Sequence, residues 1–135
     1  MTKICKHGKW DCNCVICRPQ IFCGHDRTRG KCPTCRPKSG YRMYVTNAKN
    51  RKLSFKLTFK VFLALVGSPC YFCGVKPANG IDQHVAGVGY VKTNCVPCCF
   101  ICNRMKSYFT TARFLNQISK IMLHMREKNE SKETD

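Results

Sequence analysis

The spacing of apolar and polar residues predicts a short strand and a short helix near the middle of the chain. Residues 53–57 alternate in the manner of a strand. Thr58 can cap a helix that follows, and the breakers at residues 67–69 would end it. The apolar face of this helix would be formed by Phe59, Phe62, Leu63 and Val66.

The same pattern predicts two helices in the C-terminal part. Residues 103–109 look helical, and Thr110 or Thr111 can cap a longer helix after them. Large apolar side chains share one face of this longer helix, at Phe114, Ile118, Ile121, Met122 and Met125. We expect this face to pack into the core rather than to form a binding groove. Residues 127–135 are polar and highly charged, which predicts a frayed tail.

The first 38 residues contain a cysteine and histidine pattern that repeats after eighteen residues. Each unit reads C-x-H-x6-C-x2-C, and three thiolates with one imidazole suit a tetrahedral zinc ion. The register aligns Cys12 with Gly30, which favours Cys14 over Cys12 as a ligand. The repeat therefore predicts two zinc modules, held by Cys5, His7, Cys14 and Cys17 and by Cys23, His25, Cys32 and Cys35.

A disulfide framework is the alternative interpretation of these cysteines. Zinc is favoured because the thirteen cysteines are an odd number, no signal peptide is recognisable, and histidine recurs in step with cysteine. We therefore expect an intracellular reducing compartment, which would be the nucleus, the cytoplasm or a virion. Residues 1–40 hold few large apolar side chains, so metal must stabilise them, and structural zinc contributes about 10–16 kcal/mol in small modules.

The net charge of +17 is concentrated in the first half of the chain. Residues 1–60 carry fifteen Lys or Arg against two acidic residues, a net +13, whereas residues 61–135 carry nine against five, a net +4. Such a surface binds polyanions with a strong dependence on salt, so we expect a nucleic-acid partner, which can be DNA or RNA as far as the charge shows. No membrane role is expected, because the longest aliphatic stretch, residues 61–66, is too short to span a bilayer.

A further zinc site is predicted in the second half. Cys70 and Cys73 form a zinc knuckle in the run C-Y-F-C-G, and Cys99 and Cys102 are the best partner pair. Cys95 and Cys98 have the same spacing, so spacing alone leaves the choice open. With Cys12, these two are the cysteines left over, and we expect Cys95 and Cys98 to be buried thiols that behave as small apolar groups.

The second half also resembles the HNH endonucleases, in the zinc-knuckle form carried by phages and large DNA viruses. The resemblance covers roughly residues 50–108 and rests on an ordered set of motifs: C-Y-F-C-G at 70–74, G-I-D-Q-H at 80–84, G-Y at 89–90 and N-C-V-P-C-C-F-I-C-N-R-M-K at 94–106. The N-terminal units resemble short repeats found beside such domains in large-virus proteins.

The resemblance implies a small, zinc-stabilised α+β fold with a ββα-metal, treble-clef-like core. Its expected organisation is two tandem zinc modules in residues 1–38, a basic linker in 39–52, an HNH-like domain with a C-terminal helix in 53–126 and a polar tail in 127–135. The linker could lie along a nucleic-acid backbone. The four-cysteine zinc would be structural, which gives three structural zinc ions per chain.

The resemblance also implies a catalytic centre. Asp82 and Asn103 would hold a catalytic Mg²⁺ or Mn²⁺, for which their hard oxygen atoms are suited, and Asn94 would pin the loop between the strands and the helix. The family's general-base histidine falls on Gln83, whose amide cannot accept a proton from water near neutral pH, a loss of roughly 10²- to 10⁴-fold in rate. His84 is the nearest candidate for a displaced base, although strand alternation would point it to the other face.

Two hypotheses of function follow. The first is a metal-dependent nuclease that nicks or cuts DNA, weakened by Gln83. The second is a non-catalytic architectural, packaging or ribonucleoprotein component, built on a degenerate HNH fold within a larger nucleoprotein or virion assembly.

Overall fold

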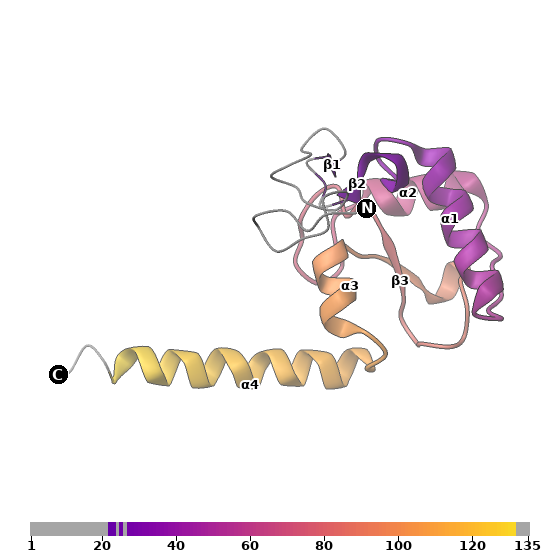
Figure 1. Ribbon diagram of the computed structural model, residues 1–135. Coiled ribbons are helices and arrows are strands. Elements are labelled where there is room, and N and C mark those ends of the chain that lie inside the picture. Colours follow the sequence, from indigo (N-terminus) through magenta and orange to yellow (C-terminus); the bar gives the residue numbers. More distant parts are fainter. Residues whose placement is uncertain (1–21, 24, 26, 132–135) are drawn as a thin grey trace, which may run out of the picture.

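The computed structural model describes residues 22–23, 25 and 27–131 (Figure 1). The first zinc repeat, together with Trp10 and Cys12, lies outside the described residues. The elements follow in this order: β1 (Phe22–Cys23), β2 (Arg27–Thr28), the 3-10 helix η3 (Arg29–Lys31), α1 (Pro37–Asn50), α2 (Phe59–Gly67), β3 (Ile81–Gln83), the 3-10 helix η4 (Lys92–Asn94), β4 (Cys95–Pro97), α3 (Phe100–Lys106) and α4 (Thr111–Glu130).

Helix α1 corrects the prediction of a linker in residues 39–52. Pro37 stands at the start of the helix, where its fixed φ favours helix and its missing N–H costs nothing. Tyr44 and Ala48 are buried, and the Tyr44 hydroxyl accepts a hydrogen bond from the Ile81 backbone N–H at 3.2 Å. The segment is basic and polar as a whole because only one narrow face of the helix, at Gly40, Tyr44 and Ala48, is buried.

Helix α2 forms as predicted. The Thr58 side chain accepts a hydrogen bond from the Val61 N–H at 3.3 Å, and Phe62 and Val66 are buried. Leu63 remains partly exposed, at 37%. The main core cluster gathers around Phe62 and contains the buried side chains Tyr44, Ala48, Leu57, Phe62, Val66, Ile81, Tyr90 and Cys95.

The strand expected in residues 53–57 is reduced to one isolated bridge, between Phe55 and Tyr90. Ser54 accepts a backbone hydrogen bond from Tyr90 at 2.7 Å, and the chain on either side does not continue the ladder. Gly89 allows this close approach, since its φ is +102° and a Cβ there would lie 2.8 Å from the Ser54 carbonyl oxygen.

Strands β3 and β4 form an antiparallel pair, and α3 follows β4 directly, which gives the order ββα. The register pairs Ile81 with Pro97, Asp82 with Val96 and Gln83 with Cys95. Helix α3 begins at Phe100, three residues earlier than predicted, because the Cys99 sulfur caps it by accepting the Cys102 N–H. The helix ends at Lys106, because the next residue, Ser107, has a φ of +50°, outside the helical range.

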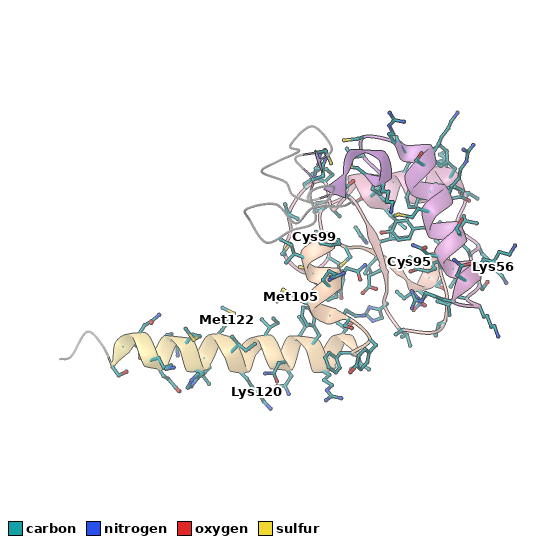
Figure 2. All side chains as sticks on the ribbon, viewed as in Figure 1. Lys56, Cys95, Cys99, Met105, Lys120 and Met122 are labelled. Carbon is teal, nitrogen blue, oxygen red and sulfur yellow. The ribbon has the colours of Figure 1, made fainter. Side chains whose placement is uncertain are left out.

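Helix α4 begins where predicted, with the Thr110 hydroxyl accepting the Arg113 N–H at 3.2 Å. The prediction that its apolar face is core is wrong for most of its length. Phe114 is buried and packs edge-on against Phe72, with ring centroids 5.3 Å apart, whereas Met122 is 68% exposed. The helix runs out from the body of the molecule (Figure 1), and Lys120 and Met122 project from this outer part (Figure 2).

The predicted fraying from residue 127 is also corrected, because α4 continues to Glu130. Arg126 and Glu130 form an exposed i,i+4 ion pair at 3.7 Å, and the residues of this segment favour helix. No helix in the described part of the chain combines the length and the apolar character needed to cross a membrane.

Asn79 joins the second zinc unit to the body of the molecule. Its Oδ1 accepts hydrogen bonds from the Thr34 N–H at 2.9 Å and the Thr34 hydroxyl at 2.6 Å, and its Nδ2 donates to the His25 carbonyl at 3.3 Å. Pro33 adds a close contact, since a Cβ on Gly40 of α1 would lie 2.7 Å from its Cα. The unit is therefore packed onto the HNH-like part rather than tethered to it.

We predict that Asn79→Gly lowers the free energy of unfolding by about 1–3 kcal/mol, because the hydrogen bonds of the buried Asn79 side chain to Thr34 and His25 are lost. Glycine keeps the positive φ of 60° at this position, so backbone strain does not contribute. Chemical denaturation followed by circular dichroism measures the change. Asn116→Ala, which removes an exposed amide from α4, is the control, and equal stability of the two variants would refute the role of Asn79.

Candidate functional site

Four cysteines converge where the loop after α2 meets the start of α3. Cys70 and Cys73 come from the knuckle, Cys99 caps α3, and Cys102 lies in its first turn. Their sulfur atoms all lie within 4.8 Å of one another. The structure therefore selects Cys99 and Cys102, and not Cys95 and Cys98, as the partners of the knuckle.

The distances in this cluster fit zinc and not a disulfide. The Cys73 and Cys99 sulfurs are 3.7 Å apart. Sulfurs bound to zinc at about 2.3 Å in a tetrahedron lie ~3.8 Å apart, whereas a disulfide requires about 2.0 Å. The residues present thus fit a structural zinc ion.

Backbone N–H groups prepare Cys70 to bind as a thiolate. Burial alone would raise the pKa of Cys70, but N–H groups of Cys73, Cys99 and Phe72 point at the sulfur and lower the pKa to about 6. One of these contacts runs from the Cys99 N–H to the Cys70 sulfur at 3.3 Å. Burial and the neighbouring Cys99 raise the pKa of Cys102, which favours the neutral thiol. A cation bound in the cluster would favour the thiolate instead.

The second cluster consists of Cys23, His25, Cys32 and Cys35, as the repeat predicted. The His25 Nδ1 atom lies 3.6 Å from the sulfurs of both Cys32 and Cys35. A nitrogen and a sulfur on one tetrahedral zinc are ~3.6 Å apart. Zinc bound here would join the β1–β2 hairpin to the turn that leads into α1.

Cys95 and Cys98 are buried, as predicted for the leftover thiols. Burial raises the pKa of Cys95 to about 11, with a further contribution from the nearby Asp82 carboxylate. Burial likewise raises the pKa of Cys98. Both therefore remain neutral thiols near neutral pH.

A polar pocket of about 550 Å³ lies between β3 and α3 and brings together Asp82 and Asn103, 21 residues apart in sequence. The lining side chains are Arg51, Asp82, Gln83, Ala86, Tyr90, Asn103, Arg104, Ser107 and Tyr108. Two arginines at the wall give the pocket a positive rim, which suits an anionic ligand such as a phosphodiester.

Asn103 and Asp82 are held in different ways. The Asn103 Nδ2 donates to the Ile81 carbonyl at 3.3 Å, which leaves its Oδ1 as the atom available to a cation. Asp82 Oδ2 is buried and forms an ion pair with the Lys106 ammonium at 2.9 Å.

Gln83 and His84 do not present a base to this pocket. Gln83 is buried, and its Oε1 accepts a hydrogen bond from the Gly89 N–H at 2.8 Å, so the amide supports the loop. His84 is exposed and is not among the side chains that line the pocket. Its ring lies edge-on to Tyr71, with centroids 6.2 Å apart.

Asn94 ties down the loop that follows β3. Its Oδ1 accepts the Val85 N–H at 2.9 Å, and its Nδ2 donates to the carbonyls of Val85 and Gly89, each at 3.0 Å. The Asn94 carbonyl also accepts the His84 N–H at 2.8 Å. Asn94 thus holds residues 85–89, in the loop between β3 and β4, and its expected role between the strands and the helix stays a prediction.

Sequence reasoning missed Lys106, Arg51 and Arg104. Lys106 stands inside the motif N-R-M-K, but a lysine at a helix end is normally exposed, so nothing in the sequence singled it out. Arg51 and Arg104 belong to different elements, and only the fold brings them to one pocket. The one available signal was spacing, since Asn103 and Lys106 are i and i+3 on α3.

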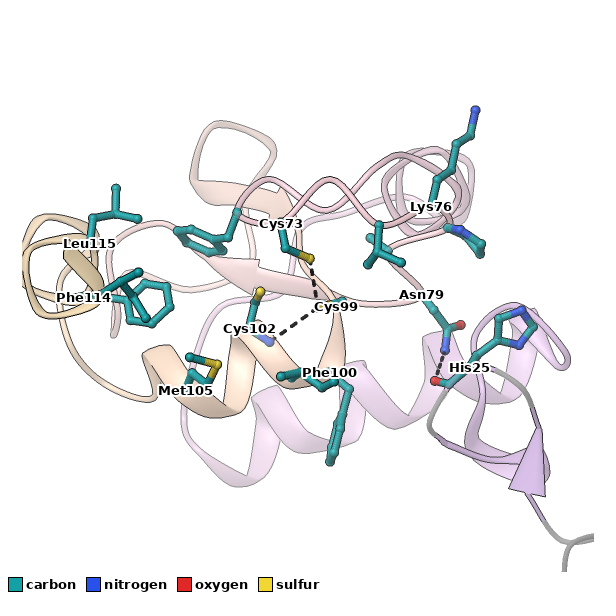
Figure 3. Close-up of a pocket in the computed structure, with 16 residues that line it drawn as sticks. His25, Cys73, Lys76, Asn79, Cys99, Phe100, Cys102, Met105, Phe114 and Leu115 are labelled. Carbon is teal, nitrogen blue, oxygen red and sulfur yellow. Dashed lines mark hydrogen bonds between the residues drawn. The ribbon is translucent and has the colours of Figure 1, made fainter. Parts of the chain in front are cut away.

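A second cavity, also of about 550 Å³ and mainly apolar, lies over the four-cysteine cluster. Figure 3 shows Phe114 and Leu115 of α4 at one end and His25 at the other, with Cys73, Cys99 and Cys102 between them. Its lining includes Cys73, Cys99 and Cys102 of the four-cysteine cluster and His25 of the second cluster.

Comparison with known proteins supports the fold. The rare-cutting HNH restriction endonuclease PacI has a similar structure, with a TM-score of 0.53 and 21% sequence identity over 94% of this chain and 99% of the PacI chain. No family model matches the chain. An uncharacterized protein of Acanthamoeba polyphaga mimivirus is 40% identical over 78 residues, which is 56% of this chain but 15% of that protein. The chain thus has an HNH-like fold and a viral relative.

We predict that Cys102→Ser lowers the zinc content by about one ion per chain and destabilises the fold, because the cluster loses a thiolate ligand. Elemental analysis of the purified protein measures the content. Cys98→Ala is the matched control, since it removes an equally buried neighbouring sulfur and should leave the zinc content unchanged. A loss of zinc in the control equal to that in Cys102→Ser would contradict the ligand assignment.

We also predict that Asp82→Asn destabilises the protein by about 3–5 kcal/mol, because it leaves the fully buried Lys106 ammonium without a counter-charge. The double variant Asp82→Asn with Lys106→Met should recover most of that loss. Urea unfolding curves of the wild type, both single variants and the double variant give the coupling energy. Additive effects of the two substitutions would rule out the pairing.

Proposed function

We propose that this chain is a zinc-organised nucleic-acid-binding protein whose polar pocket is an HNH-type centre for cleaving phosphodiester bonds. The observation that carries the proposal is the meeting of Asp82 and Asn103 at one pocket of an HNH-like fold, beside two arginines. PacI, of similar fold, is an HNH restriction endonuclease, which supports DNA as the substrate.

The donor set of the pocket fits a hard divalent cation. Asp82 offers a carboxylate, one oxygen of which is paired with the Lys106 ammonium, and Asn103 offers an amide oxygen. These two side chains would hold Mg²⁺ or Mn²⁺. Such an ion, when bound, polarises the scissile phosphate and offsets charge on the leaving oxygen.

The surrounding side chains would bind and orient the nucleic acid. The Arg51 Nη1 donates to the Tyr90 hydroxyl at 3.4 Å, and the Arg104 guanidinium lies 5.5 Å from the centre of the Phe100 ring, so both arginines have fixed directions. Guanidinium groups bind phosphate through paired N–H donors. Tyr108, 77% exposed at the rim, offers a ring on which a base can stack.

His84 is the residue we propose as a displaced general base, and its ring lies against Tyr71, outside the lining of the pocket, in this structure. The second candidate function is nucleic-acid binding without cleavage, in a packaging or ribonucleoprotein role. One observation favours it: the lining of the pocket, in the described part of the chain, includes no histidine. The likeness to a mimivirus protein supports a viral setting for either function.

The other parts of the proposal concern metal and surface charge. We propose three structural zinc ions per chain, with the third in the first repeat, at Cys5, His7, Cys14 and Cys17. The basic N-terminal half would supply most of the affinity for nucleic acid, through release of counterions. Binding to a duplex should therefore weaken steeply between 50 and 200 mM salt, by about 10³-fold or more for six or more phosphate contacts.

The test is nicking of supercoiled plasmid by the full chain in Mg²⁺ or Mn²⁺. We expect Asp82→Asn and Asn103→Ala to lose about 10²-fold or more of the activity, and His84→Ala to lose 10²- to 10⁴-fold if His84 is the base. His124→Ala, an exposed histidine on α4, should retain full activity. If the wild type and all variants are inert but retard DNA with a steep salt dependence, the binding function replaces the nuclease.

A further inference from the structure

Lys106 is buried more completely than any other charged side chain in the described part of the chain, with an exposed fraction of 0%. It is the last residue of α3, yet its stem runs inward and not along the surface. Its ammonium lies 2.9 Å from Asp82 Oδ2 and donates a hydrogen bond to the Gln83 carbonyl at 3.2 Å. Burial of a charged lysine is unfavourable in free energy because the ammonium loses its hydration. The ion pair with Asp82 and the hydrogen bond to the Gln83 carbonyl offset that loss.

Asn103 and Lys106 together hold α3 against β3 on both sides of Asp82. They lie one turn apart on α3 and so project from the same face of the helix. Asn103 donates to the Ile81 carbonyl and Lys106 to the Gln83 carbonyl, and these carbonyls flank Asp82 in the strand. The Asp82 carboxylate is thereby fixed at the point where its strand, the helix and the pocket meet.

The ion pair also changes what the pocket can bind. A free carboxylate would repel a phosphodiester and attract a divalent cation, but the Lys106 ammonium offsets that charge from inside the protein. A cation at Asp82 must then approach the buried Lys106 ammonium a few ångströms away, and repulsion by a buried charge is stronger than repulsion in bulk solvent. The arginines at the rim retain their attraction for phosphate.

We propose that Lys106 is a positioning residue that holds Asp82 and lowers the affinity of the pocket for divalent cations, so that a phosphodiester binds whether or not an ion is present. This inference rests on the proposed site at Asp82 and Asn103. It differs from the proposed function in that it concerns how tightly the ion binds, and it holds for either candidate function. Lys106 touches neither phosphate nor ion in this role.

The test measures Mn²⁺ binding directly, by the electron paramagnetic resonance signal of free Mn²⁺ during titration of the zinc-loaded full chain. Thiolate and imidazole clusters retain zinc in the presence of Mn²⁺, which binds such ligands more weakly. Lys106→Met should bind Mn²⁺ at least about tenfold more tightly than the wild type, which corresponds to about 1.4 kcal/mol. The double variant with Asp82→Asn should lose this gain.

Two further variants make the measurement decisive. Lys106→Gln offers Asp82 an uncharged N–H donor and should show the same gain in Mn²⁺ affinity. It replaces Lys106→Met in the test if that variant does not fold. Lys120→Met, on the exposed part of α4, removes one positive charge far from the pocket and should leave Mn²⁺ affinity unchanged. A structural defect alone would weaken Mn²⁺ binding, so a gain identifies the electrostatic role. Unchanged, weaker or undetectable Mn²⁺ binding by folded Lys106 variants would overturn the proposal.

A binding assay separates this inference from the proposed function. In buffer freed of divalent ions by a chelating resin, the wild type should bind a DNA duplex as well as it does with Mn²⁺. Lys106→Gln should bind the duplex at least about threefold more tightly with Mn²⁺ than without it. Absence of plasmid nicking would end the nuclease proposal and leave this one standing, whereas an equal Mn²⁺ requirement in wild type and variant would refute this one alone.

Discussion

The convergence of the sulfur atoms of Cys70, Cys73, Cys99 and Cys102 is the constraint on which the rest of this structure depends. It fixes the loop after α2 to the first turn of α3, and Cys99 acts both as a ligand and as the cap of that helix. Helix α3 in turn carries Asn103 and Lys106, so the direction in which the helix leaves the cluster decides where the polar pocket lies. A strand pair of three residues each could not position these groups without that anchor.

The second cluster extends the same principle to the N-terminal side. The segment around Cys23, His25, Cys32 and Cys35 has few large apolar side chains, and its described residues join the body through the Asn79 hydrogen bonds and the contact of Pro33 with Gly40. Helix α1 follows at once and contributes Tyr44 to the core and Arg51 to the pocket. Zinc bound at this cluster would therefore couple the folding of this segment to the position of Arg51 at the pocket.

The polar pocket combines attraction for anions with an internally offset carboxylate. Arg51 and Arg104 line the wall, while Asp82 is paired with a lysine that the solvent does not reach. Gln83 supports the loop at Gly89 in place of presenting a base. The proposed recognition of phosphate without a tightly held cation rests on this combination.

The sequence by itself indicated the cluster of Cys23, His25, Cys32 and Cys35, the cap at Thr58 and, to within one residue, the start of α4, because ligand spacing and capping are local properties. It could not decide between Cys95 and Cys99 as ligands, nor show that residues 39–52 form a helix or that most of the α4 face is exposed. The choice of cysteine ligands, the packing of α1 and the exposure of α4 all depend on tertiary contacts between segments distant in sequence. The burial of Lys106 beside Asp82 also depends on tertiary contacts. The two residues are 24 positions apart, so their pairing leaves no local pattern in the sequence.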